Sequence, residues 1–248
     1  MIVNTAAYHF VEIADPAALA EAVHERAQAL SLKGSVLVAG EGINLFLAGE
    51  APQIEAFYDW LRADARLQAL HVKYSHSQAM PFARLKVKQK DEIISFRRED
   101  ASPLRAPRAP AVAPAVLRQW LRQGHDDQGR RVVMLDTRNQ QEVAHGTFAG
   151  ALTLPITRFT ELPQALAPHR QALADATVVS FCTGGIRCEK AALWMQADGM
   201  DNVLQLDGGI LGYFEAVGGE GYEGRCFVFD ERVALDPQLR PLQDDAIA

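Results

Sequence analysis

The segment ASPLRAPRAPAVAP constrains this chain most, because four prolines fall within fourteen residues, at Pro103, Pro107, Pro110 and Pro114. Each proline fixes its φ and removes a backbone donor, so neither a helix nor a central strand can run through the segment. The 248 residues are enough for two domains of ordinary size. We therefore expect a first domain over residues 1–100, a linker over 101–113, a second domain over 114–225 and a C-terminal extension over 226–248.

Strand and helix patterns alternate in the first domain. AYHFVEI indicates a strand, and DPAALAEAVHERAQALSL indicates a helix that begins at Asp15 and Pro16. KGSVLVAGEGINLFLAGE indicates two strands joined by AGEG, APQIEAFYDWLRAD a second amphipathic helix, and LHVKYSHS a further strand. The order β-α-β-β-α-β is that of the ferredoxin-like, split βαβ unit. FARLKVKQK extends this domain by a strand whose second face is basic.

The second domain is predicted to hold a parallel sheet. AVLRQWLRQG indicates a short helix that buries Val116, Leu117, Trp120 and Leu121. The apolar strands RVVMLDTR, TVVSFC and NVLQLDGG are each followed by a helical or turn segment, which is typical of an α/β domain with helices on both faces of its sheet. Ligands bind at the carboxyl ends of such strands, where both Asp136 and Cys182 fall.

Composition narrows the classes of protein. The chain is 48% hydrophobic and 23% charged, as globular proteins are. No apolar run reaches about 18 residues, the length needed to cross a bilayer, and MIVNTAAYHF lacks the pattern of a signal peptide, so we expect a cytoplasmic protein without membrane contact. Three cysteines argue against a disulfide framework. We find no metal-ligand spacing, Walker loop or dinucleotide fingerprint, so no metal and no cofactor is identifiable from the sequence.

Charge is segregated along the chain although its net value is −6. Between residues 70 and 110, nine Lys and Arg stand against four acids. Alternate cations on a strand lie about 6.8 Å apart, which suits a phosphate backbone, and Tyr74, His76 and Phe82 could stack on unpaired bases. A solvated face is the alternative. The predicted RNA-binding residues are Arg84, Lys86, Lys88 and Lys90.

Two of the three cysteines, Cys182 and Cys188, lie between a strand and a helix in VVSFCTGGIRCEKAALWM. A thiol acts as a nucleophile only as thiolate, and its pKa falls at a helix N-terminus or among backbone N–H groups. Two consecutive glycines let the backbone turn those groups inward as an anion-holding nest. We expect Cys182 to be the nucleophile, the alternative being a buried structural cysteine. The cradle is formed by Thr183, Gly184, Gly185 and Ile186.

Spacing limits what the loop can hold. Arg187 follows Cys182 after four residues, whereas a cysteine phosphatase loop has five, so a smaller guest such as the outer sulfur of a persulfide is favoured. Arg187 either lowers the pKa of the thiol or pairs with an acid such as Glu189 or Asp136. Cys188 is either a resolving thiol or a small packed residue, and both stay open. We expect Cys226 to be a core residue.

The segment LDTRNQQEVAHGTFAGALTLPI resembles the rhodanese-domain signature, with Thr147 where many rhodaneses have His. CTGGIR resembles the rhodanese active-site loop, and LQLDGGI the last strand and its turn at Gly208 and Gly209. The resemblance implies that Asp136 and Arg138 support the loop. The signature positions are Asp136, Arg138, Glu142, Gly146, Gly150, Ala151, Leu154 and Pro155.

A narrower resemblance rests on CTGGIRCEKA together with GEGIN, RLKVKQKDEI and CFVFDERV. From about Tyr8 to Val233 the chain is similar to the bacterial rhodanese-domain tRNA uridine-34 hydroxylase family. This likeness implies an oxidoreductase that hydroxylates C5 of the wobble uridine, with O2 as co-substrate, the tRNA anticodon stem-loop as partner and catalytic roles for Cys182, Arg187 and Cys188. Longer members continue into a cysteine-bearing tail, whose metal or redox role we do not expect here.

The residues by themselves indicate only thiol chemistry, because oxygen insertion comes wholly from the resemblance. The electron donor is unknown. Two alternatives stay open: a sulfurtransferase that carries sulfane sulfur on Cys182, and a non-catalytic RNA-binding protein with a vestigial rhodanese fold.

Overall fold

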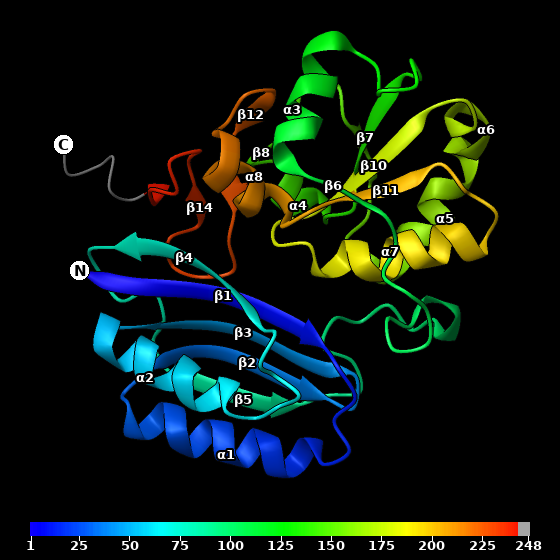
Figure 1. Cartoon of the computed structure of the whole chain (residues 1–248). Helices are drawn as coiled ribbons and strands as arrows, with labels where there is room; N and C mark the ends of the chain where they lie inside the picture. The colour runs from blue at the N-terminus through cyan, green and yellow to red at the C-terminus, as the bar shows by residue number, and fades with distance from the viewer. Residues whose placement is uncertain (243–248) are drawn as a thin grey trace. The chain divides into compact units, whose positions relative to one another are not determined.

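The computed structural model describes residues 1–242, which form two compact units (Figure 1). The first unit comprises residues 1–95, 229–233 and 240–242, and the second comprises 96–228 and 234–239. The first unit thus ends ahead of the predicted boundary at residue 100, and the predicted linker over 101–113 falls within the second unit.

The first unit is built on a five-stranded sheet in the order β4-β1-β3-β2-β5. Neighbouring strands are antiparallel except β2 and β5, which are parallel. Helices α1 and α2 cover one face of the sheet (Figure 1). The ferredoxin-like order is confirmed, with β5 added at one edge. The elements are β1 (Ile2–Phe10), α1 (Pro16–Ala29), β2 (Lys33–Ala39), β3 (Gly42–Gly49), α2 (Ala51–Arg62), β4 (His71–Ser77) and β5 (Leu85–Gln89).

Alternation along β5 separates its apolar and basic side chains. Leu85 and Val87 pack against the same core as Val36 of β2, beneath the helices. Lys86 and Lys88 therefore point to the opposite side of the sheet, which we call the helix-free face, and both are exposed.

The motif GEGIN forms the turn into β3. Gly42 has φ +143°, and a Cβ there would lie 2.0 Å from the His9 carbonyl oxygen, so only glycine fits. Glu41 Oε1 accepts a hydrogen bond from the Ile93 N–H at 2.8 Å. Asn44 Nδ2 donates to the Ile93 carbonyl at 3.2 Å. These residues hold the segment after β5 against the hairpin.

The second unit contains a five-stranded, all-parallel sheet in the order β6-β11-β10-β7-β9. Val179 and Phe181 of β10 pack in one core with α3 and α8, and the opposite face of β10 meets α7 (Figure 1). The predicted parallel sheet covered on both faces is confirmed. Its strands are β6 (Ala111–Val112), β7 (Val132–Asp136), β9 (Leu152–Thr153), β10 (Thr177–Phe181) and β11 (Val203–Leu206).

Helices and two short ladders complete the second unit. Strand β8 pairs with β12, and β13 pairs with β14, both antiparallel. The strands are β8 (Gly146–Phe148), β12 (Tyr222–Gly224), β13 (Cys226–Phe227) and β14 (Ala234–Leu235). The α-helices are α3 (Pro114–Gln123), α4 (Gln140–Val143), α5 (Leu162–Leu166), α6 (Arg170–Leu173), α7 (Ile186–Ala197) and α8 (Gly209–Val217). Three 3₁₀ turns occur at η1 (Glu99–Ala101), η2 (Phe159–Glu161) and η3 (Ala167–His169).

The proline-rich segment lies along the edge of the second sheet. Its two-residue strand β6 pairs only with β11, as the prolines require. Gln205 Nε2 donates to the Ala109 carbonyl at 3.0 Å. Arg108 forms ion pairs of 2.9 Å with both Glu189 and Asp207. The segment is thereby fixed to the unit that contains the cysteine loop.

Helix α3 corrects one core prediction. Leu117 and Trp120 are buried, whereas Val116 is 37% exposed. The buried stripe follows positions 117 and 120, one helical turn apart, and Val116 lies beside it rather than on it.

Candidate active site

The cysteine loop sits at the carboxyl end of the parallel sheet. Cys182 directly follows β10, whose Phe181 is in register with Asp136 at the end of β7. Thr183 and Gly184 make the turn, and α7 begins after Gly185, which has φ +103°. The positive φ at this N-cap is available to glycine without strain. The geometry turns the first N–H groups of α7 toward the sulfur.

Cys182 is 1% exposed, and its sulfur accepts a hydrogen bond from the Gly185 N–H at 3.1 Å. Burial opposes ionisation. The Cys188 thiol, the Arg187 charge and the N–H groups of Arg187 and Gly185 outweigh it, and they lower the pKa of Cys182 to about 6. The lowered pKa favours the thiolate, which is the form that acts as a nucleophile.

Cys188 occupies the first turn of α7 and is fully buried. Burial and the neighbouring Cys182 sulfur raise the pKa of Cys188 well above its ordinary value. The hydroxyl of Thr137 lies 3.7 Å from its sulfur, and Ser180 also contacts it. Cys188 therefore keeps its proton and donates a hydrogen bond to the thiolate. Both cysteines are free thiols.

Arg187 is buried and forms an ion pair with Glu142 of α4. Its Nη1 and Nη2 both lie 3.1 Å from Glu142 Oε1, and Nη2 lies 2.9 Å from Oε2. The structure thus gives Arg187 an acidic partner, Glu142, that was not among the acids considered from the sequence. Arg187 serves two purposes, since its charge also lowers the pKa of Cys182. The sequence marked Glu142 as a signature position but gave it no role.

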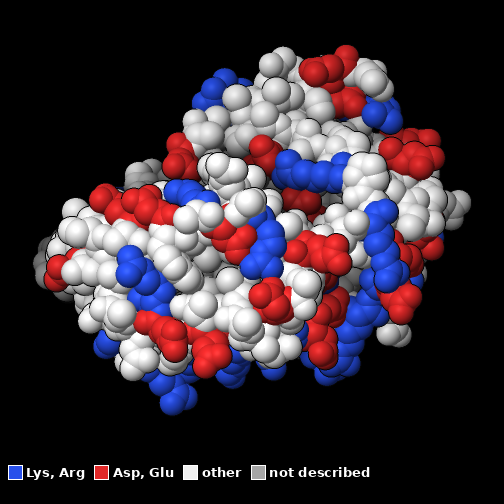
Figure 2. Space-filling model, turned by 60° about the horizontal axis from the view of Figure 1, so that its bottom comes forward, with Lys and Arg blue, Asp and Glu red and all other residues white. Residues whose placement is uncertain are grey.

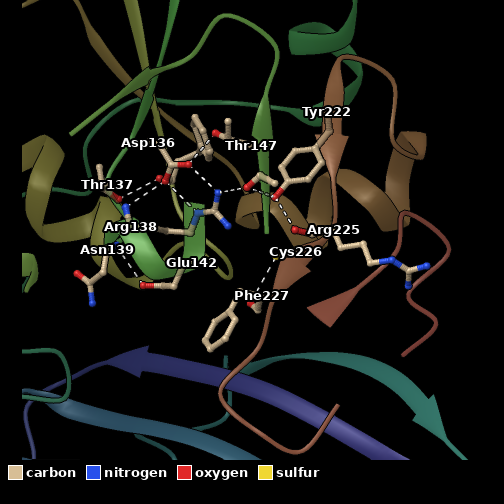
Figure 3. Close-up of polar contacts among 12 residues, drawn as sticks. Asp136, Thr137, Arg138, Asn139, Glu142, Thr147, Tyr222, Arg225, Cys226 and Phe227 are labelled. Carbon is tan, nitrogen blue, oxygen red and sulfur yellow. Dashed lines mark hydrogen bonds and ion pairs between the residues drawn. The ribbon is translucent and has the colours of Figure 1, made fainter. Parts of the chain in front are cut away.

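Asp136 and Arg138 form a fully buried ion pair (Figure 3). Asp136 accepts hydrogen bonds from the Arg138 N–H at 3.0 Å, Nε at 2.9 Å and Nη2 at 2.6 Å. Burial by itself lowers the pKa of Arg138, but Asp136 outweighs it and raises the pKa above its ordinary value. Arg138 Nη2 also donates to the Gly146 carbonyl at 2.7 Å. This pair ties the end of β7 to β8.

Thr147 adds a further hydrogen bond to the Asp136 carboxylate. Its hydroxyl donates to Asp136 Oδ2 at 2.7 Å (Figure 3). The Tyr222 hydroxyl donates to the Gly146 carbonyl at 2.8 Å.

Cys226 is fully buried, and burial raises its pKa to about 12, so it stays a neutral core thiol.

Gly209, at the start of α8, buttresses the loop. It has φ +63°, and a Cβ there would lie 2.6 Å from the Cys182 carbonyl oxygen. The next two N–H groups, of Ile210 and Leu211, donate to the carbonyls of Cys182 and Thr183 at 2.9 and 3.0 Å. The Gly-Gly turn thus fixes the backbone from which the thiolate extends.

The basic strand belongs to the first unit. Its four cations, Arg84, Lys86, Lys88 and Lys90, are all exposed. Acidic and basic side chains are interspersed on the face shown in Figure 2.

The structure separates two predicted stacking residues from that strand. Tyr74 and His76 lie on β4, at the opposite edge of the sheet from β5. Their side chains point to the face that the helices cover, not to the helix-free face. They share the side of core residue Val72. Phe82 alone of the three lies beside Arg84 and Lys86. Sheet order and strand period thus divide the three predicted stacking residues between the two edges of the sheet.

Two further observations concern residues 1–242. No group of three or more His, Cys, Asp or Glu side chains there is arranged to hold a metal ion. None of the helices in this range has the length and apolar character needed to span a membrane.

A cysteine at the end of a central parallel strand, cradled by the start of the next helix, is the arrangement of a rhodanese-like domain. Residues 117–216 match the rhodanese-like domain model, and residues 2–93 match the UPF0176 acylphosphatase like domain. The solved rhodanese-like domain from an Anabaena protein is 22% identical, covering 46% of this chain and 79% of that one, with a TM-score of 0.37. The chain is a rhodanese-domain protein.

Curated relatives extend over nearly the whole chain. The tRNA uridine(34) hydroxylase of Xanthomonas campestris pv. campestris (strain 8004) is 76% identical over 246 residues, which are 99% of this chain and 97% of the relative. The protein of the same name from Xylella fastidiosa (strain M23) is 70% identical over 244 residues, covering 98% and 95%. This chain belongs to the tRNA uridine(34) hydroxylase family.

Replacing Cys188 tests its role as a hydrogen-bond donor. Cys188→Ala removes the donor and should raise the pKa of Cys182 by about one unit or more, because hydrogen bonds to charged groups contribute about 1.5–3 kcal/mol. Cys188→Ser keeps a donor and should shift it less. Ultraviolet absorbance of the thiolate, followed against pH, measures the transition, and Cys182→Ser should lack it. An unchanged midpoint in Cys188→Ala would rule the role out.

A second pair of variants tests the Gly-Gly turn. Gly150 and Gly209 have nearly the same positive φ, +68° and +63°, but only at Gly209 would a Cβ meet backbone. Both alanine variants should lose about 1–3 kcal/mol of stability through strain. Only Gly209→Ala should also raise the pKa of Cys182, because it displaces the loop. Equal titration curves in the two variants would contradict the buttress.

Proposed function

We propose that this protein is an enzyme that hydroxylates C5 of the wobble uridine, position 34, in tRNA, using Cys182 as its reactive thiol. The observation that carries the proposal is a cysteine pKa lowered to about 6 inside a cradle of backbone donors, in a chain 76% identical to a protein named for this activity. The residues proposed to act with it are Arg187 and Cys188, which lower that pKa.

The overall chemistry sets what else is needed. Converting the C5–H bond to C5–OH with O2 places one oxygen atom on the base and releases the other as water. Two electrons and two protons complete the balance, so the reaction needs a two-electron reductant as well as O2. We propose O2 as the co-substrate and the anticodon stem-loop as the part of tRNA that is bound.

The chain's own residues supply a nucleophile and its stabilisation. The thiolate is available at neutral pH without a separate base, because the loop N–H groups and the Cys188 thiol replace the water it loses on burial. A thiol of this kind can also carry a sulfane sulfur as a persulfide. That property is shared with the sulfurtransferase alternative, which family membership does not favour.

The cellular test is a nucleoside analysis. tRNA from cells lacking this protein should lose nucleosides derived from 5-hydroxyuridine on mass analysis, and the wild-type gene should restore them. Cys182→Ser should fail to restore them although the protein accumulates normally. An unchanged nucleoside profile, where no compensating pathway operates, would refute the function, and full restoration by Cys182→Ser would favour a non-catalytic RNA-binding protein.

Intact mass shows whether Cys182 carries a sulfane sulfur, and thiocyanate turnover then distinguishes the sulfurtransferase alternative. Thiosulfate treatment should add one sulfur atom to the wild type and none to Cys182→Ser. Rapid thiocyanate formation from cyanide would support that alternative.

Charge reversal tests the basic strand. The double variant Lys86→Glu, Lys88→Glu should weaken binding of tRNA and lower the slope of log affinity against log salt by about 1 for each phosphate that is no longer neutralised. The matched control, Arg122→Glu with Arg158→Glu, changes net charge equally at exposed cations of the second unit and should leave the slope unchanged. Equal effects in the two double variants would show that only total charge matters.

A further inference from the structure

A pocket opens beside the basic strand, wholly within the first unit. It has a volume of about 320 Å³ and lies on the helix-free face, against β2, β3 and β5. This volume is at the lower end of the roughly 300–1,000 Å³ typical of small-molecule sites. Its lining includes Ser35, Phe46, Phe82, Arg84, Lys86 and Phe229.

The chemistry of the lining is aromatic and basic. Phe46, Phe82 and Phe229 supply apolar rings, Arg84 and Lys86 supply positive charge, and none of the lining residues within 1–242 is acidic. Flat, anionic ligands match this combination, because a ring stacks on phenylalanine while a phosphate binds the cations. An unpaired nucleotide has both parts, and base stacking on aromatic side chains is how single-stranded RNA is commonly bound.

Phe229 is held in place although it is 52% exposed. Next to it, Asp230 accepts hydrogen bonds from Arg232 Nε at 2.8 Å and Nη2 at 2.6 Å. Arg232 Nη1 donates to Ser75 Oγ at 2.7 Å, and the Glu231 N–H donates to the Pro81 carbonyl at 3.1 Å. These contacts fix the segment that carries Phe229 at the pocket, where its ring forms part of the lining.

The floor of the pocket is formed by close backbone contact. Gly34 has φ +144°, and a Cβ there would lie 2.0 Å from the Phe46 carbonyl oxygen. Ser35 is in register with Phe46 on β3 and with Lys86 on β5. One row across three strands therefore presents an aromatic ring, a hydroxyl and a cation on the same face.

We propose that this pocket binds one unpaired nucleotide of the RNA substrate, with its base against Phe82 and Phe229 and its phosphates on Arg84 and Lys86. The inference rests on the proposed function for the identity of the RNA. The lining residues of this pocket all belong to the first unit, whereas Cys182 belongs to the second.

Binding of two RNAs to the full chain tests the pocket. The first is an anticodon stem-loop carrying 2-aminopurine at one loop position after another, and the second is a fully paired duplex of the same length. Phe229→Ala should raise the Kd for the stem-loop about 5- to 150-fold and leave the Kd for the duplex and the salt slope unchanged. Wild-type protein should change 2-aminopurine fluorescence at one loop position, and Phe229→Ala should abolish that change.

Control variants keep the result interpretable. Phe229→Tyr keeps a stacking ring and should bind nearly as the wild type does. Tyr74→Ala removes an aromatic ring that is 42% exposed on the opposite side of the same sheet, and it should have no effect. If Phe229→Ala and Phe82→Ala both bind the stem-loop as the wild type does, or weaken duplex binding equally, the proposal is overturned.

The outcomes also separate this proposal from the proposed function. Unchanged RNA binding in the phenylalanine variants, with hydroxylation still dependent on Cys182, would refute the nucleotide pocket and support the proposed hydroxylase function. Loss of stem-loop binding in those variants, with modified nucleosides independent of Cys182, would refute the proposed hydroxylase function and support the nucleotide pocket.

Discussion

A negative charge on the sulfur of a residue that is 1% exposed is the constraint on which the second unit depends. Water cannot solvate such a charge, so fixed donors have to replace it. Gly185 can donate because it accepts a positive φ, and Cys188 because burial keeps it protonated. Arg187 donates its backbone N–H and adds the positive charge of a guanidinium that Glu142 holds. The parallel sheet, the start of α7 and the Gly-Gly turn of α8 all serve to keep those donors in place.

One local arrangement braces loops in both units. An Asp accepts a hydrogen bond from the N–H two residues later and pairs side by side with the guanidinium of that same residue, an Arg, which gives a short turn two charge-assisted bonds. It occurs at Asp64 and Arg66, Asp136 and Arg138, and Asp230 and Arg232. The first pair is partly exposed, whereas the other two are buried. The buried pairs are those next to the thiol loop and to Phe229.

The sequence predicted what depends on local pattern. Strand and helix periods gave the β-α-β-β-α-β order and the parallel sheet, and the turn glycines placed Cys182 at a strand end. The sequence could not predict contacts between residues that are far apart in the chain. Glu142 and Arg187 are 45 positions apart, and nothing in their spacing indicates that they pair. Tyr74 and His76 seemed close to the basic strand along the chain, but folding put them on the far edge. The prediction that Val116 is buried was wrong because the pattern of a helix only ten residues long does not define how wide its buried stripe is.

Among the strands of residues 1–242, β5 stands at one edge of the first sheet, with β2 as its neighbour on the other side. An edge of this kind is a template for pairing with a second copy, and lysines are a common means of preventing it. Lys86 and Lys88 place such charges on this edge, and their repulsion opposes pairing with the same strand of a second copy. The cations that we propose for contact with an RNA backbone therefore also disfavour pairing of this edge with another strand.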